Sequence, residues 1–123
     1  MTFQTTYNLA MALCDEMATG GVVNAATTKS YLSRAPHLLT MLHSEVSHIL
    51  DIPAVEIALT DEPQCGEYVT LTVLPFGLAA MLLADENPQL ASFYQQRFED
   101  AKRRIPITPK PIVDVFGIRG GVR

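Results

Sequence analysis

Three histidines fall within one predicted helix and are the first candidates for chemistry, because imidazoles bind metals and transfer protons. They are His37, His43 and His48. Helical geometry places His37 and His48 on one face but roughly 16 Å apart, too far for a single metal ion. Glu45 and His48 have the Glu-x-x-His spacing of di-iron bundles, but such a site needs a second copy of the pair, which the sequence lacks. We therefore predict no metal site and interpret the histidines as surface or capping residues.

Other residue types that carry chemistry also lack a recognisable pattern. The glycine pairs Gly20-Gly21 and Gly120-Gly121 match neither a phosphate-binding loop nor a dinucleotide fingerprint. Cys14 and Cys65 lack metal-ligand spacing, and we expect both to be free thiols of a reducing compartment, with Cys14 in the core. We predict no catalytic residue, no cofactor and no enzymatic activity.

Composition indicates one globular domain, because 48% of the 123 residues are hydrophobic and only 18% are charged. Charge is uneven. Residues 51–100 hold nine acids against Arg97 alone, and residues 101–123 hold six basic residues against Asp114. Either these two regions attract each other between copies, or both are solvated charge. No export signal or membrane association is expected from the uncharged start MTFQTTYN and the absence of an apolar run of about 20 residues.

Three adjacent basic residues, Lys102, Arg103 and Arg104, are candidates for contacts with DNA phosphates or with acids of another subunit. The alternative is that they complement the dipole at the C-terminal end of a helix and keep the chain soluble. The sequence leaves both interpretations open.

Two helices joined by a tight corner are predicted in the second half of the chain. Residues 74–84 are apolar almost all round, which is typical of a buried helix. Asn87 is a suitable N-cap and Pro88 a suitable first residue for the next helix. That helix carries one apolar stripe, made of Leu90, Phe93, Tyr94, Arg97, Phe98, Ala101 and Ile105. We predict that the core of the helix pair consists of Leu74, Phe76, Leu78, Leu82, Phe93, Tyr94 and Phe98.

The rest of the chain is predicted as helices, one loop and an arm. A helix over residues 7–18 is capped by Thr5 or Thr6, with a buried face of Leu9, Ala10, Leu13, Cys14 and Met17. Pro36 divides the next helical region into residues 27–34 and 36–50. Residues 51–72 form a long loop with a candidate strand at 67–71. The fold class is therefore all-α: residues 1–105 form a compact bundle of four to five helices, and residues 106–123 form an extended, proline-rich arm.

Three motifs occur in order in the second half. They are a Leu-Pro-aromatic-Gly-Leu-Ala start at 74–79, an acidic-Pro corner at 85–88, and a helix with Ala91, Phe93, Tyr94, Arg97, Phe98 and Glu99. The chain thereby resembles the small helical head–tail connector proteins of tailed bacteriophages, also called adaptor or head-completion proteins. Asp114-Val115-Phe116-Gly117 is similar to the Asp-x-Tyr-Gly ending of that family, with Phe in place of Tyr.

This resemblance implies a structural virion protein of the neck, made in the bacterial cytoplasm. Such proteins form a homo-oligomeric ring, usually a dodecamer, between the portal and the tail or its stopper protein. The ring continues the DNA channel without reading the DNA sequence. We expect the arm to dock on a neighbouring subunit or the portal, through Ile112, Val113, Val115, Phe116, Ile118 and Arg119.

Two alternatives stay open at this point. One is a tail-completion protein or another structural protein of a virion or prophage. The other belongs to a different class, a small helical DNA-binding or regulatory protein. The isoelectric point of about 5.2 and the lack of a basic recognition helix argue against the second alternative.

Overall fold

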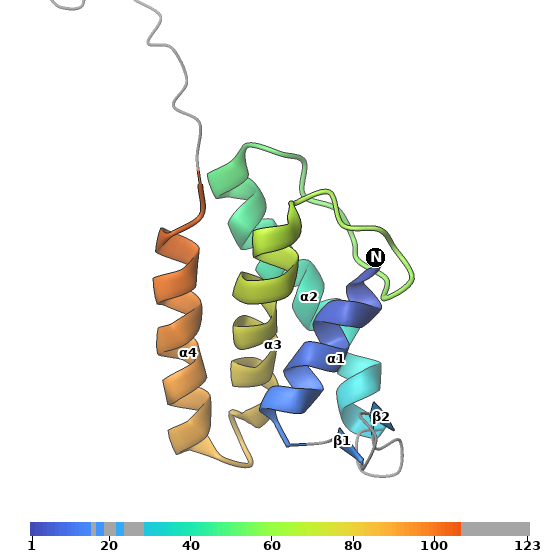
Figure 1. Cartoon of the computed structure of the whole chain (residues 1–123), viewed down its shortest axis with the longest axis vertical. Helices are drawn as coiled ribbons and strands as arrows, with labels where there is room; N and C mark the ends of the chain where they lie inside the picture. Colours follow the sequence, from blue (N-terminus) through green and yellow to red (C-terminus); the bar gives the residue numbers. More distant parts are fainter. Residues whose placement is uncertain (16, 19–21, 24–28, 107–123) are drawn as a thin grey trace, which may run out of the picture.

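Helix α3 lies at the centre of a helical bundle, between α4 on one side and α1 on the other (Figure 1). We describe residues 1–15, 17–18, 22–23 and 29–106 of a computed structural model. In chain order its elements are α1 (Phe3–Leu13), β1 (Met17–Ala18), β2 (Val22–Val23), α2 (Lys29–Leu50), the π-helix η1 (Val69–Val73), α3 (Leu74–Leu83) and α4 (Pro88–Arg103). The two-residue strands pair antiparallel as a local bridge. The predicted all-α bundle is confirmed.

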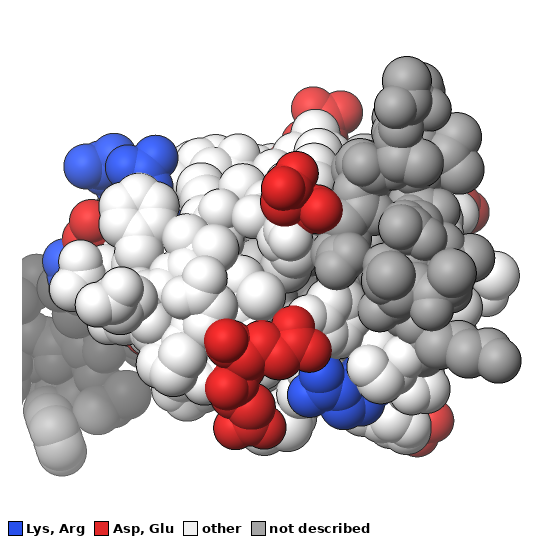
Figure 2. Space-filling model, turned by 90° about the horizontal axis from the view of Figure 1, so that it is seen from below, with Lys and Arg blue, Asp and Glu red and all other residues white. Residues whose placement is uncertain are grey.

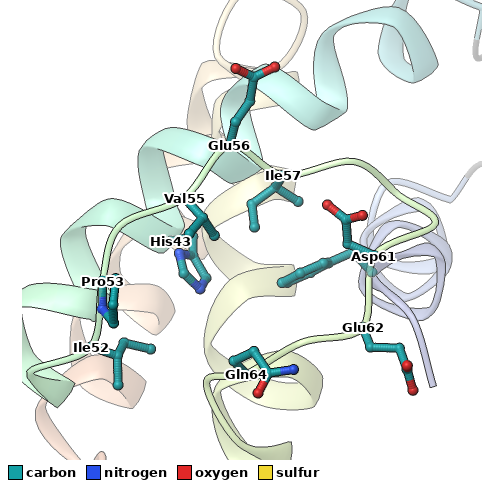
Figure 3. Close-up of a pocket in the computed structure, with 10 residues that line it drawn as sticks. His43, Ile52, Pro53, Val55, Glu56, Ile57, Asp61, Glu62 and Gln64 are labelled. Atoms are coloured by element: carbon teal, nitrogen blue, oxygen red, sulfur yellow. The ribbon is translucent and has the colours of Figure 1, made fainter.

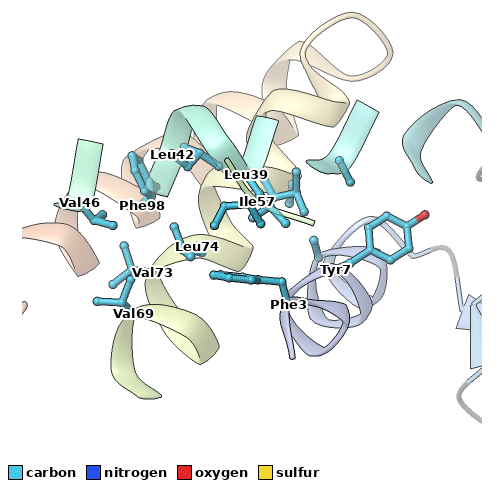
Figure 4. Packing of buried hydrophobic residues seen from close by; sticks show 14 of the residues in the cluster. Phe3, Tyr7, Leu39, Leu42, Val46, Ile57, Val69, Val73, Leu74 and Phe98 are labelled. Atoms are coloured by element: carbon cyan, nitrogen blue, oxygen red, sulfur yellow. The ribbon is translucent and has the colours of Figure 1, made fainter. Parts of the chain in front are cut away.

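The hydrophobic core surrounds α3 because this helix is apolar on all sides and contacts α1, α2, η1 and α4. Figure 4 shows Phe3 of α1 and Phe98 of α4 entering one cluster around Leu74, with Leu39 and Val46 of α2. All five of these side chains are buried. The prediction of a buried central helix is thus confirmed.

Helix α1 begins earlier than the sequence pattern predicted, at Phe3 instead of residue 7, and Thr2 is its N-cap. The physical reason is a tertiary contact. The backbone N–H groups of Phe3 and Gln4 donate to the carbonyls of Asp61 and Leu59, at 3.0 and 2.9 Å, so the loop satisfies the first turn. The helix also ends earlier, at Leu13, and Asp15 follows with a φ of 59°.

The predicted buried face of α1 was therefore only partly correct. Only Ala10 of that set is fully buried, Leu13 and Cys14 are partly buried, and Leu9 is exposed. Met17 belongs to β1. The side chains that α1 does bury are Phe3, Thr6, Tyr7, Ala10 and Met11.

Helix α2 runs through Pro36 without the predicted break. Proline removes one backbone hydrogen bond from a helix interior. Here the apolar face on both sides of it is buried against α3, and Ala35 and Leu39 are fully inaccessible. Burial of this face outweighs the local preference against helix before proline. The helix ends at Leu50, where Asp51 adopts a φ of 58°.

The predicted strand at 67–71 is wrong, because residues 67–68 are helical and residues 69–71 belong to η1, which continues directly into α3. The Thr70 hydroxyl donates to the Gly66 carbonyl at 2.8 Å, and the Thr6 hydroxyl of α1 donates to the Thr70 carbonyl at 2.9 Å. These buried hydroxyls satisfy backbone groups at the widened turn, so β-branched residues are accommodated in a helix. Of the loop predicted at 51–72, residues 52–66 are confirmed as a loop, and residues 67–72 are helical.

The corner between α3 and α4 is confirmed, with the Asn87 side chain accepting from the Leu90 N–H at 3.2 Å and Pro88 first in the helix. Of the predicted core of this pair, Leu74, Leu78, Leu82 and Phe98 are buried, and Phe76 and Tyr94 are partly buried. Phe93 is a correction, since its side chain is 52% exposed. Ala91 and Ala101, which are small enough for α4 to approach α3, complete the contact with Phe98.

Candidate functional site

The arm residues predicted to dock on a partner, 112–119, lie outside the described residues, and the description ends at Pro106. Their role stays a prediction. The described part of the chain nevertheless offers two surfaces suited to binding. They differ in position and in chemistry.

The first surface, here called the aromatic face, combines side chains of α1, η1, α3 and α4. A hollow of about 340 Å³ lined by Leu9, Leu13, Leu71 and Phe76 forms one part of it. The rings of Phe76 and Phe93 flank Tyr94, with centroid distances of 6.1 and 5.6 Å to it. The face consists of Leu9, Leu13, Leu71, Phe76, Phe93, Tyr94 and Arg97.

Arg97 of the aromatic face contacts two of its aromatic rings. Its guanidinium carbon lies 5.3 Å from the Phe76 ring centroid and 5.9 Å from that of Phe93. The Tyr94 hydroxyl donates to the Leu13 carbonyl at 2.7 Å, and burial raises the pKa of this phenol, with a smaller contribution from Cys14. Exposed aromatic and arginine side chains are the types enriched at the energetic centres of protein interfaces.

From the sequence, Phe76, Phe93 and Tyr94 were predicted in the core of the helix pair, and Leu9 and Leu13 on the buried face of the first helix. The predicted stripe on α4 mixes buried and exposed side chains. Phe93 and Phe98 differ by five positions and therefore point in different directions. Arg97 in the middle of the stripe was the available signal, since an arginine at such a position marks the edge of the buried face.

The second surface, here called the acidic groove, lies between α1, the C-terminal half of α2 and the loop. Figure 3 shows His43, Val55 and Ile57 directed toward a common space, with the carboxylates of Glu56 and Glu62 at its outside. The groove has a volume of about 460 Å³. It is lined by Phe3, His43, Ile52, Pro53, Val55, Glu56, Ile57, Asp61, Glu62 and Gln64.

Hydrogen bonds hold the loop side of the acidic groove in place. The Thr40 hydroxyl accepts from the Ile57 N–H at 2.9 Å and donates to the Pro36 carbonyl at 2.8 Å. An Asp61 carboxylate oxygen accepts from the Ala58 N–H at 2.9 Å. Together with the bonds from the first turn of α1 to the loop carbonyls, they make the groove a preformed feature.

His43 is buried at the floor of the acidic groove, which corrects its interpretation as a surface residue. Its Nδ1 lies 3.1 Å from the Ser47 hydroxyl, and its ring stands edge-on to Phe3 at a centroid distance of 6.0 Å. Burial lowers the pKa of the imidazole, so it is neutral at pH 7. His37 and His48 are exposed, as expected. No three metal-binding side chains converge among the residues described here.

The predicted basic trio is partly engaged within the bundle. Lys102 Nζ lies 2.5 Å from Glu45 Oε1 and 2.9 Å from Glu99 Oε1. Burial would lower the pKa of this ammonium, but the hydrogen bonds and charges of the two glutamates outweigh it, so the pKa is raised. Arg103 pairs with Asp100 at 3.1 Å. Arg103 and Arg104 are exposed, and they are the members of the trio placed to contact phosphates.

The cysteines form no disulfide. Cys65 is buried beside the Thr70 hydroxyl, 3.4 Å away, and burial raises the pKa of its thiol, which opposes nucleophilic reactivity. Cys14 is partly buried against the core, as predicted.

The end of the bundle where α3 turns into α4 is mostly uncharged. Figure 2 shows this end with acidic side chains in separate groups, and one basic group lies directly beside the largest of them. Asp85 and Glu86 of the corner are exposed, and the Tyr31 hydroxyl of α2 donates to the Glu86 carboxylate. The negative charge predicted for the middle of the chain is thus distributed over the corner, the loop and the outer side of α4.

Comparison with known proteins gives no match: no family model fits the chain, and no curated protein or solved structure is significantly similar to it. No helix in the described ranges is long and apolar enough to cross a membrane.

Proposed function

We propose that this chain is a structural subunit of a bacteriophage neck, a head–tail connector that assembles into a ring between portal and tail. The motifs at 74–99 and 114–117, which resemble those of connector proteins, motivate the choice of class. In this proposal the chain acts through its surfaces and has no catalytic role. DNA passes through the ring, and contact with it is electrostatic and independent of sequence.

The observation that carries the proposal is the presence of two unlike binding surfaces on one small bundle. The acidic groove includes Phe3 at the start of α1, and the aromatic face includes Leu9 and Leu13 in its second half. A closed ring is built by heterologous contacts, in which one surface of a subunit meets a different surface of the next. A subunit of such a ring therefore needs two distinct surfaces.

The aromatic face supplies the apolar contact that an assembly requires. Phe93 and Leu71 are 52% and 40% exposed, and they belong to one face with Phe76 and Tyr94. Contiguous exposed apolar surface that polar residues surround is typical of interaction sites. In the proposed ring this face is buried against the neighbouring subunit or the portal.

Mass measurement in solution tests the proposal. Light scattering and electron microscopy of the full chain, alone and with portal-containing capsids, are expected to show a ring with a central channel or a monomer that joins capsids. Phe93→Ser is expected to reduce assembly without unfolding the bundle. Met41→Ser is the matched control, because Met41 is 60% exposed on α2 and belongs to neither surface.

A full-length chain that stays monomeric and ignores capsids would contradict the proposal. Equal loss of assembly in both variants would also count against it, because the aromatic face would then have no special part. A tail-completion role would appear as binding to tails in place of portal-containing capsids.

A further inference from the structure

The acidic groove combines an apolar floor with a rim of one charge. Phe3 and Ile57 are buried at its floor, and Val55 remains 51% exposed. Three lining residues, Glu56, Asp61 and Glu62, carry carboxylates, and none of the lining residues is Lys or Arg. A groove of this kind suits an extended segment that has both apolar and basic side chains.

The C-terminal arm has this composition. Residues 112–118 read IVDVFGI, and Arg119 and Arg123 follow. The segment 112–123 thus has six bulky apolar residues and two arginines against Asp114. Arginine forms bidentate pairs with carboxylates, and Glu56 and Glu62 lie exposed at the rim to receive them.

We propose that the acidic groove of one copy of this chain binds residues 112–123 of another copy. Apolar arm residues would fill the space above His43 and Ile57, and Arg119 and Arg123 would pair with the rim carboxylates. This inference deepens the proposed function, on which it rests, by naming the surface that receives the arm in the assembly.

Charge favours the groove over the aromatic face as the site for the arm. The charged residue of the aromatic face is Arg97, which would repel Arg119 and Arg123. The groove offers carboxylates at the corresponding positions around its apolar floor. The two surfaces thus have different occupants, with the arm in the groove and a flatter partner on the aromatic face.

The composition of the segment after α4 favours docking between copies. The chain leaves the bundle at the same end as the loop of the groove, with α3 between α4 and α1 (Figure 1). Pro106, Pro109 and Pro111 follow in close succession. Prolines at this spacing predict a stiff, extended segment of about 3.1 Å per residue, which would favour docking on another copy over folding back.

Cysteine cross-linking in the full chain tests the contact directly. A tagged Val55→Cys variant is mixed with a Phe116→Cys variant, both carrying Cys14→Ala, and oxidised mildly. We expect a disulfide-linked heterodimer on non-reducing gels. Met41→Cys in place of Val55→Cys is the matched control and is expected to give no heterodimer above the level of each variant alone.

Charge exchange tests the specificity of the contact. Glu62→Lys should weaken assembly roughly tenfold or more, because like charges would then face each other. Arg119→Glu should do the same, and the combined variant should recover most of the loss. Asp85→Lys reverses one exposed acid outside the groove and is expected to leave assembly near that of the unmodified chain.

The outcomes separate this inference from the proposed function. A full chain that is monomeric and ignores capsids overturns both. A chain that assembles, but gives no heterodimer and no recovery in the combined variant, overturns the inference alone. A chain that carries both Val55→Cys and Phe116→Cys gives the third outcome. If it cross-links only within itself, the inference is also overturned, because the arm would then occupy its own groove.

Discussion

Gly77 of α3 faces Phe98 of α4 with no room for a side chain between them. A Cβ at position 77 would lie 2.9 Å from Phe98 Cδ1 and 2.9 Å from Leu42 Cδ2. The close approach of the two helices therefore depends on a glycine that is intrinsically unfavourable in a helix. The motif at 74–79 thus has a structural explanation at this position, whatever the function of the chain.

Gly77→Ala is expected to destabilise the bundle. Alanine improves helix propensity by about 1 kcal/mol, but overpacking against a rigid ring costs about 1–3 kcal/mol, and the second effect should dominate. Chemical denaturation measures the result. Gly77→Ala should be less harmful in a chain that also carries Phe98→Leu. The double variant is then more stable than the sum of the two separate losses predicts.

Elements determined by local residues were predictable from the sequence, and elements determined by tertiary contacts were not. The α3–α4 corner was predictable because Asn87 and Pro88 act locally. The start of α1 was not, because Phe3 and Gln4 are capped by carbonyls of Asp61 and Leu59, more than fifty positions away. The continuity of α2 through Pro36 likewise depends on burial against α3, which local propensity does not contain.

The candidate site was less predictable than the fold, for a related reason. The acidic groove joins residues of α1, α2 and the loop, and its members have no shared spacing in the sequence. The sequence did indicate that the acidic loop and the apolar arm needed partners. The sequence did not indicate which helices would lie beside the loop and form the groove with it.

Pro36→Ala is expected to stabilise the protein by about 1–2 kcal/mol. Alanine restores the N–H that donates to the Leu32 carbonyl, worth up to about 3 kcal/mol in a helix interior. The greater freedom of the unfolded chain offsets about 0.4–1 kcal/mol of this gain. Thermal unfolding measures the shift.

Pro88→Ala is the matched control for this substitution. Pro88 is the first residue of α4, where the missing N–H has no helical partner in any case. No gain is expected there. Equal stabilisation at both positions would show that Pro36 carries no special penalty within α2.

His43 is expected to make stability depend on pH in mildly acidic solution. Burial lowers its pKa below the ordinary value of 6.5, so the unfolded chain binds a proton more readily than the folded one. The free energy of unfolding should therefore be highest above pH 6.5 and fall as the pH decreases toward the lowered pKa. Denaturation curves collected across this range measure the slope.

Two variants assign that slope to a residue. His43→Leu should remove it, and the Ser47 hydroxyl would still donate to the carbonyl of residue 43, at 2.6 Å in the native chain. His48→Gln should retain it, because His48 is exposed. A slope in the same pH range that survives His43→Leu would show that His43 is not its source.

Lys102→Met is expected to reduce stability by up to about 1 kcal/mol at low salt, because it keeps the aliphatic stem and removes the charge that pairs with Glu45 and Glu99. The loss should shrink in 1 M salt as screening weakens the pairs. Arg103→Met is the matched control with a more exposed ion pair, 73% for the arginine side chain, and should have little effect. If Lys102 instead served mainly to contact phosphates, its substitution would leave stability unchanged and reduce the salt dependence of DNA binding. Its two glutamate partners within the bundle favour the first outcome.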